Sequence, residues 1–156
     1  MGPTSANMSP ARFVFVRTQD AKDKLVPLMS EGNQEKVRLA PVSVIIGHDL
    51  DFAQKLPFLF PHTDAKSWFE GASDEVLDRV GLQNATLQGA YLVMAARSLG
   101  LDTGPMTGFD IDKVGETFFP NTRIKANMIV NIGVGNPNSI FERSPRLPFE
   151  EAAKIV

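Results

Sequence analysis

The sequence Ser73-Asp74-Glu75-Val76-Leu77 begins the longest regular stretch of the chain, which continues to Gly100. Ser73 is a helix-capping residue type, the two acids suit a first helical turn, and glycine is typical just past a helix end. Apolar residues between these limits recur at helical spacing, interrupted by Asn84. They are Leu77, Val80, Leu87, Tyr91 and Met94. We therefore predict a central helix over residues 73–99, with this apolar stripe along one of its faces.

Upstream of this helix, strand and helix signals alternate. The β-branched and aromatic run at 12–17 predicts a strand, and the near-continuous apolar run at 41–47 predicts a strand buried on both faces. Helices are expected over 19–25, capped by Thr18, and over 31–38. The chain therefore starts with two strands separated by helices.

The segments on either side of the long helix differ in character. Residues 50–70 hold several aromatic side chains around prolines, which indicates short helices and a packed lid. Beyond the long helix we expect a glycine-bounded turn over 102–108, a helix over 110–118 and a third strand over 123–133. A last helix starts at Phe149. Interspersed strands and helices predict an α/β or α+β fold.

The composition limits the class of protein. At 156 residues with 43% hydrophobic side chains, the chain 1–156 has the size and apolar content of one domain. A net charge of −2 provides no field that would attract nucleic acid or an anionic membrane. The absence of cysteine excludes disulfides, thiolate metal sites and a cysteine nucleophile. No membrane span or signal peptide is recognised, so we expect a cytoplasmic protein with no membrane or nucleic-acid partner.

Several reaction classes lack their signatures. The sequence contains neither a phosphate-binding Walker loop nor a nucleophile elbow. Gly133-Val134-Gly135 follows a predicted strand, but the third glycine of a dinucleotide fingerprint is missing, which favours an ordinary turn. His48 and His62 lack the spacing of metal ligands, so we expect no metal site.

Backbone donors and small polar side chains gather in a few loops. Pro3-Thr4-Ser5-Ala6-Asn7 offers two hydroxyls and an amide, and Asn33 and Lys36 share one helix face. Gly104-Pro105-Met106-Thr107-Gly108 presents backbone N–H groups ahead of a helix, and Arg143 and Arg146 can hold a phosphate. These parts suit a planar cofactor with a phosphate group, but each of them alone is more often an ordinary turn or a solvated charge.

Long motifs in a fixed order carry a more specific signal. Gly2-Pro3-Thr4-Ser5-Ala6-Asn7 and Leu99-Gly100-Leu101-Asp102-Thr103-Gly104-Pro105-Met106-Thr107-Gly108-Phe109-Asp110 resemble the flavin-dependent nitroreductase family. Leu56-Pro57-Phe58-Leu59-Phe60-Pro61-His62 and Arg146-Leu147-Pro148-Phe149 resemble its malonic semialdehyde reductase branch, which belongs to pyrimidine degradation. The resemblance implies an α+β three-layer sandwich, with helices around a mostly antiparallel sheet, that works as an intertwined homodimer.

The resemblance also implies FMN at the subunit interface. The residues that it assigns to FMN are Pro3, Thr4, Ser5, Asn7, Asn33, Lys36, Pro105, Met106, Thr107, Gly108 and Arg146. The first four would reach the flavin of the partner subunit, and Arg146 would meet the phosphate. The family often has a second basic residue two positions before it; that position is Ser144 here, which implies either a weaker hold on the phosphate or substitution by Arg143. As catalytic groups, Lys36 would stabilise negative charge on reduced flavin, and a backbone N–H of Thr107 or Gly108 would lie near N5.

The implied activity is a ping-pong oxidoreductase in which NADH or NADPH reduces FMN and an oxidised substrate then accepts the hydride. For this branch the acceptor would be malonic semialdehyde, which gives 3-hydroxypropionate. Nitroaromatic or quinone reduction and a flavin-free, non-catalytic dimer are the alternatives. The expected substrate lid consists of Phe58, Phe60, Trp68 and Phe69, with His62 or Lys66 near its mouth and Lys66 or Arg79 for a carboxylate. Simple core packing of these aromatic residues is the competing interpretation.

The start of the chain adds two expectations. Family members carry a helix before the loop at residues 2–7, with an arginine- and serine-containing motif for the FMN phosphate, and this chain starts at Met1 within that pattern. We therefore expect weak FMN binding and partial purification as apo-protein. In the expected dimer, the opening loop crosses to the partner, and small residues of the long helix lie near the two-fold axis. These are Gly89, Ala90, Ala95 and Ala96.

Overall fold

The centre of the molecule is a four-stranded sheet in the order β1-β2-β4-β3, with every neighbouring pair antiparallel. The computed structural model describes residues 2–156. Its strands are β1 (Ala11–Val16), β2 (Val42–Asp49), β3 (Asp102–Met106) and β4 (Ile124–Gly133). Because β2 and β4 lie in the middle, they contribute most of the sheet residues in the core.

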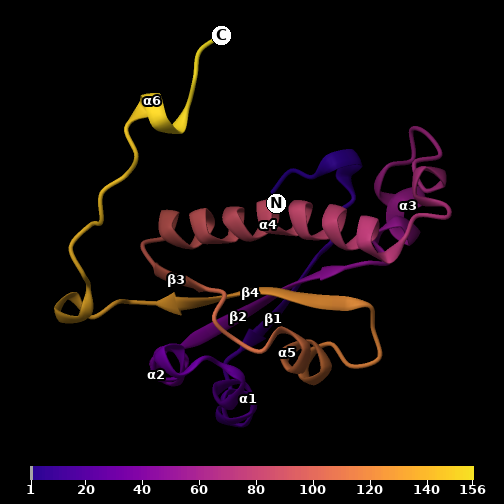
Figure 1. Cartoon of the computed structure of the whole chain (residues 1–156). Helices are drawn as coiled ribbons and strands as arrows, with labels where there is room; N and C mark the ends of the chain where they lie inside the picture. The colour runs from indigo at the N-terminus through magenta and orange to yellow at the C-terminus, as the bar shows by residue number, and fades with distance from the viewer. Residues whose placement is uncertain (1) are drawn as a thin grey trace.

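Helices cover both faces of the sheet and produce three layers (Figure 1). One face is covered by α4 (Asp74–Ser98), and the other by α1 (Gln19–Leu25), α2 (Glu31–Leu39) and α5 (Ile111–Phe118). Alternate residues of the middle strands serve the two layers: Ile45 packs with the α1-α2-α5 side, whereas Val44 and Ile46 pack with α4. The architecture confirms the predicted α+β sandwich.

Local signals place most elements where the sequence predicts them. The side chains of Thr18, Ser73 and Asp110 accept hydrogen bonds from backbone N–H groups in the first turns of α1, α4 and α5. The turn η2 (Val26–Leu28) follows α1 where Pro27 interrupts the helix. β2 has six consecutive buried residues, because it pairs on both sides and is covered on both faces.

The apolar stripe of α4 does not face the sheet over its second half and is exposed in this chain. Leu87, Tyr91 and Met94 are 46%, 51% and 65% exposed. The buried residues of the helix are small or polar, and Leu92 and Val93 are the half-buried apolar residues that pack against Val44, Ile46 and Val130 of the sheet. A Cβ on Gly89 would lie 3.1 Å from Ile46 Cδ1 of the same chain. Gly89 and Ala96 are therefore buried within this chain, which contradicts their predicted place at a dimer axis, whereas Ala90 and Ala95 are exposed.

The predicted turn at 102–108 is also wrong in part, because residues 102–106 form the edge strand β3. Its composition is poor in strand formers, and the strand exists by pairing with β4, with Gly104 opposite Asn131 and Met106 opposite Ile129. Pro105 is compatible with this position, because an edge strand has one side that needs no N–H donor. The prediction holds only for Thr107 and Gly108, which lie between β3 and α5.

The segment after β2 contains η3 (Phe52–Lys55), α3 (Leu56–Leu59) and η4 (Ser67–Phe69), as the prediction of short helices requires. Phe52 and Leu56 are buried and anchor it. At the other end, residues 134–156 are all exposed and form an arm that leaves the sheet after β4, with η5 (Pro137–Ser139) and α6 (Phe149–Ala152) (Figure 1). Among residues 2–156, no helix is both long and apolar enough to cross a membrane.

Candidate functional site

The predicted residues of α2 and of the loop before α5 meet at one place, which we call the α2–Gly108 corner (Ser30, Asn33, Lys36 and Gly108). The Lys36 ammonium donates to Asn33 Oδ1 at 3.1 Å, and Asn33 Nδ2 donates to the Gly108 carbonyl at 3.2 Å. The backbone N–H of Ser30 donates to the same carbonyl at 3.0 Å. Asn33 thus connects the lysine to the loop, and its contact with Lys36 is made along the helix face that the two residues share.

Backbone pairing holds this corner together. Met29 and Phe109 form an isolated antiparallel bridge, and the Asp110 N–H donates to the Leu28 carbonyl at 2.8 Å. Both contacts tie the segment before α2 to the segment before α5. Thr107 is exposed and Gly108 is half-buried, so the loop faces solvent beside the Lys36 ammonium. Pro105 and Met106 belong to the end of β3 that leads into it.

Two polar residues of the sheet, which the sequence analysis did not identify, hold the backbone of α2 at Lys36. Asn131 on β4 donates through Nδ2 to the Lys36 carbonyl at 2.9 Å, and its Oδ1 accepts a 2.6 Å hydrogen bond from Ser43 Oγ on β2. Ser43 is fully buried. The only available signal was a polar residue at an interior position of each apolar strand, and the pairing of these residues was not predictable from it.

The predicted N-terminal residues lie on the other side of the sheet, beside α4 (Figure 1). Pro3, Ser5 and Asn7 are exposed, and Thr4 is half-buried. The Ser5 N–H donates to Asn84 Oδ1 at 2.8 Å, and Asn7 Nδ2 donates to the Leu59 carbonyl at 2.9 Å. Within one chain, the sheet therefore lies between these residues and the α2–Gly108 corner.

The predicted phosphate ligands lie on the arm. Arg143 and Arg146 are exposed, and Arg146 Nη1 donates to the carbonyls of Ser144 and Pro145 next to it. The arm leads away from the sheet and helices (Figure 1). One chain thus presents its predicted cofactor residues as three separate groups: the N-terminal loop, the α2–Gly108 corner and the arm.

The predicted lid residues divide into two groups. The Phe60 ring lies 5.4 Å from that of His62 and 6.2 Å from that of Trp68, measured between centroids, and Phe58 is 85% exposed. The Phe69 ring packs edge-on against buried Phe52 at 4.9 Å, and both Phe60 and Phe69 pack against the buried cluster that includes Phe52 and Leu56. Lys66 is half-buried. The predicted lid aromatics therefore comprise two exposed residues, Phe58 and Trp68, and two half-buried residues that pack on the core, Phe60 and Phe69.

Two carboxylates near the ends of the helices have perturbed acidity. A hydrogen bond from the Lys113 side chain lowers the pKa of Asp110, the cap of α5. Burial raises the pKa of Asp78, but hydrogen bonds from His48 and Lys125 outweigh it and hold that pKa below its ordinary value. His48 is itself buried, with Nε2 2.7 Å from Asp78 Oδ1. The pair connects β2 to α4 and lies outside the corner.

Hollows and metal-ligand groups do not point to a different site. A shallow hollow of about 520 Å³ lies between α5 and the start of β4, and none of the predicted cofactor residues lines it. Within residues 2–156, no group of His, Cys, Asp or Glu is arranged to hold a metal ion. The α2–Gly108 corner combines a cation, an amide and an exposed loop, which are donors for a ligand rich in oxygen and nitrogen acceptors.

Similar proteins identify the family of this chain. A proposed NADH dehydrogenase/NAD(P)H nitroreductase of Stenotrophomonas maltophilia is 60% identical over 99% of this chain and 78% of its own length. A protein of the same description from Xanthomonas oryzae is 57% identical over the same shares.

Solved structures match the fold at lower identity. A proposed nitroreductase of Bacillus subtilis has a TM-score of 0.90 at 23% identity, over 100% of this chain and 82% of that one. A proposed nitroreductase of Exiguobacterium sibiricum, solved in complex with FMN, has a TM-score of 0.87 at 23% identity, over 99% and 80%. The sequence model of the protein family described as Nitroreductase family matches residues 1–135 of this chain. With most of its length matched by that model and nearly all of it by relatives above half identity, the chain belongs to the nitroreductase family.

Proposed function

We propose that the protein is an FMN-dependent oxidoreductase that takes electrons from NADH or NADPH. The observation that carries the proposal is the α2–Gly108 corner, where Asn33 holds the Lys36 ammonium beside the exposed Thr107–Gly108 loop. The donor set fits FMN, because the pyrimidine edge of its ring carries carbonyl and nitrogen acceptors. The FMN complex of the structural neighbour and the NAD(P)H nitroreductase descriptions of the relatives support the cofactor and the donor.

FMN, when bound, carries a hydride from the nicotinamide to an oxidised acceptor, so no side-chain nucleophile is required. In this chain, Lys36 supplies positive charge where negative charge develops in the transition state, and Asn33 holds the ammonium in place through its Oδ1. A backbone N–H of Thr107 or Gly108 orients the ring. Arg143 and Arg146 serve the phosphate with charge-assisted hydrogen bonds.

The working unit in this proposal is a homodimer. The three groups of cofactor residues are separated in one chain, and a second copy supplies the group that the first one cannot bring to its own corner. The exposed apolar residues favour such an assembly. They lie on the outer face of α4 (Leu87, Tyr91 and Met94) and on the arm (Phe141, Leu147, Phe149 and Ile155). Light scattering of the FMN-supplemented protein should give twice the chain mass, and a monomeric mass would refute this assembly.

Malonic semialdehyde is the proposed acceptor. The aldehyde carbon gains the hydride, its oxygen gains a proton from solvent, and the product is 3-hydroxypropionate. Lys66 and Arg79 are the candidates for the cation that binds its carboxylate, with Phe60, His62 and Trp68 as the lid. Of the two variants Lys66→Ala and Arg79→Ala, one should have a raised KM for the aldehyde. An unchanged KM in both variants would remove this role.

A nitroaromatic or quinone is the second candidate acceptor, which the descriptions of the relatives favour. A steady-state assay of FMN-supplemented protein with malonic semialdehyde beside a nitroaromatic distinguishes the two acceptors. Oxidation of neither NADH nor NADPH with either acceptor would refute the oxidoreductase and favour a non-catalytic dimer.

Lys36→Ala tests the corner itself. We expect the activation free energy of flavin reduction to rise by about 2–4 kcal/mol, with a smaller loss of FMN affinity. The reason is that the Lys36 ammonium interacts most strongly with the negative charge that forms on the flavin during reduction. Lys24→Ala removes an exposed lysine from α1 and is the matched control. Stopped-flow reduction at the wild-type rate in Lys36→Ala would contradict the assignment.

A further inference from the structure

Helix α4 carries two buried polar residues whose side chains serve a different segment. Asn84 and Gln88 are 5% and 7% exposed and lie one helical turn apart. Asn84 Oδ1 accepts the Ser5 N–H at 2.8 Å, and Gln88 Oε1 accepts the Ala11 N–H at 3.0 Å. Asn84 is the residue that interrupts the apolar pattern of the helix. Its polarity is explained by the N-terminal loop that it contacts.

The loop that these residues hold has an unfavourable backbone. Ala6, Asn7 and Ser9 have φ angles of 45°, 49° and 42°, a region that side chains other than glycine rarely occupy. Inside the loop, the Ser9 N–H donates to Thr4 Oγ1 at 3.1 Å. A short segment with three such residues needs contacts from the surrounding structure to keep one conformation.

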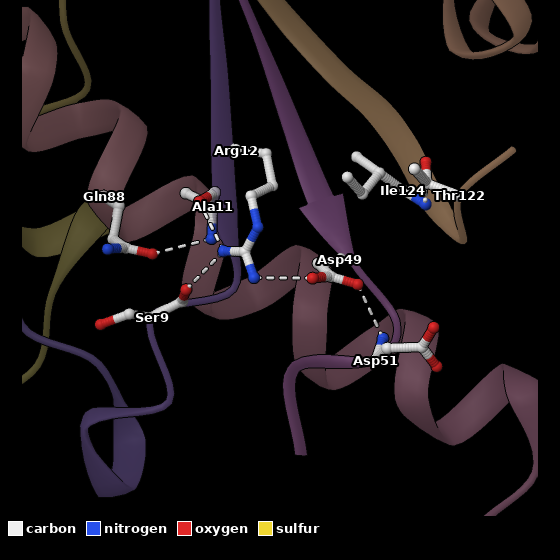
Figure 2. Close-up of polar contacts among 8 residues, drawn as sticks. All are labelled: Ser9, Ala11, Arg12, Asp49, Asp51, Gln88, Thr122 and Ile124. Carbon is white, nitrogen blue, oxygen red and sulfur yellow. Dashed lines mark hydrogen bonds and ion pairs between the residues drawn. The ribbon is translucent and has the colours of Figure 1, made fainter. Parts of the chain in front are cut away.

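The end of the loop is fixed separately, by Arg12 (Figure 2). Its Nη1 donates to the carbonyls of Ser9 and Ala11, each at 3.0 Å, and its Nη2 forms a 2.6 Å ion pair with Asp49 Oδ2. Arg12 and Gln88 therefore act where the loop joins β1, at the edge of the sheet. Asn84 reaches the interior of the loop, at Ser5.

We propose that Asn84 is a positioning residue that preorganises the Thr4–Asn7 loop for the cofactor bound at the partner's α2–Gly108 corner. The inference rests on the proposed function for the identity of the cofactor. The role is indirect, since the Asn84 side chain is buried and its two hydrogen bonds go to Ser5 and to the Val80 carbonyl. Without its acceptor, the folded chain keeps α4 and the sheet but lets the loop sample other conformations, and the cofactor then has to order it.

Three variants separate this role from a general loss of stability. Asn84→Leu keeps a similar volume and removes both the acceptor for Ser5 and the donor to the Val80 carbonyl, whereas Asn84→Asp loses the amide donor and keeps an acceptor oxygen for Ser5. Ala85→Gly is the matched control. Ala85 is a fully buried neighbour of Asn84 on α4, and its replacement by glycine lowers helix stability while the acceptor for Ser5 is kept. Each full-length variant is measured by hydrogen exchange of the residue 3–9 peptide without FMN, by thermal unfolding and by FMN titration.

We expect Asn84→Leu to exchange faster in the loop peptide and to bind FMN about tenfold more weakly, the effect of losing one hydrogen bond of about 1.4 kcal/mol. Asn84→Asp should restore most of both properties, and Ala85→Gly should lower the unfolding temperature with loop exchange and FMN affinity unchanged. Wild-type exchange or wild-type FMN affinity in Asn84→Leu would overturn the positioning role alone, as would equal FMN losses in Ala85→Gly. A wild-type chain that binds no FMN would overturn the proposed function together with this inference.

Discussion

Replacing Gly108 by alanine tests whether Asn33 and the loop before α5 are in direct contact. A Cβ at this position would lie 2.7 Å from Asn33 Nδ2 and 3.1 Å from Ser30 Oγ. The first distance is below van der Waals contact, so the Asn33 side chain must move. It then loses its 3.2 Å hydrogen bond to the Gly108 carbonyl and its fixed position against the Lys36 ammonium.

The magnitude follows from these contacts. One neutral hydrogen bond contributes about 1 kcal/mol, and overpacking adds roughly 1 kcal/mol where the neighbour can rotate away. Gly108→Ala should therefore lower the free energy of unfolding by about 2 kcal/mol. Asn33→Ala should cost about 1 kcal/mol by itself. In the double variant, the clash with Asn33 is gone and only the 3.1 Å approach to Ser30 Oγ remains, so Gly108→Ala should then cost only about 0.5 kcal/mol.

The assay is urea unfolding of all four proteins at one fixed protein concentration, since an assembling protein has concentration-dependent stability. Gly32→Ala is the control on the same helix as Asn33: nothing lies within 4 Å of its added Cβ, and it should stabilise the protein by about 0.5–1 kcal/mol. Equal costs of Gly108→Ala with and without Asn33, within about 0.5 kcal/mol, would refute the proposed contact.

Other changes have equally definite expected results. Lys22→Met should lower the free energy of unfolding by about 1–3 kcal/mol, because the buried ammonium donates to two carbonyls at the end of α2; chemical denaturation measures this, and an unchanged midpoint would show that water replaces the lysine. Asn131→Leu should slow flavin reduction severalfold, with the KM for NAD(P)H unchanged, because it releases the Lys36 carbonyl; stopped-flow reduction at the wild-type rate would contradict this. The pKa of Asp78 is lowered in the folded state, so its ionised form stabilises the protein above the ordinary value near 3.8, and this contribution is lost as the pH falls through the lowered pKa. Thermal unfolding of Asp78→Asn should accordingly depend less on pH in this acid range than that of the wild type, and parallel pH profiles would disagree with the role of His48 as its partner.

The helices were predictable because their signals are local. A capping side chain accepts a hydrogen bond from a backbone N–H only three residues further along the chain, as Thr18, Ser73 and Asp110 show. The buried strand β2 was predictable for a related reason, since burial on two faces leaves a continuous apolar run. These features narrowed the fold class to α/β or α+β, and the family resemblance then implied α+β.

The position of β3 and the orientation of α4 were not accessible in the same way. β3 is a strand because β4 lies beside it, and its own residues are typical of a turn. The apolar period of α4 shows where its large side chains gather but not which neighbour covers them. The opposite face of α4, which includes Gly89, packs against the sheet. Helix and sheet are packed so closely there that little room is left for a side chain at Gly89.

The candidate site divides along the same line. From the sequence alone, Asn33 and Lys36 share a helix face, and the motifs assign the N-terminal loop, the Thr107–Gly108 loop and the arm to one cofactor. Only the tertiary structure decides that Asn33 bonds to Gly108, that Asn131 supports Lys36 and that Asn84 holds Ser5, across 75, 95 and 79 residues of chain. Such hydrogen bonds join positions with no periodic relation, and they form because the packing of α2, α4 and β4 brings polar groups together, of which Asn84 is buried and must find a partner.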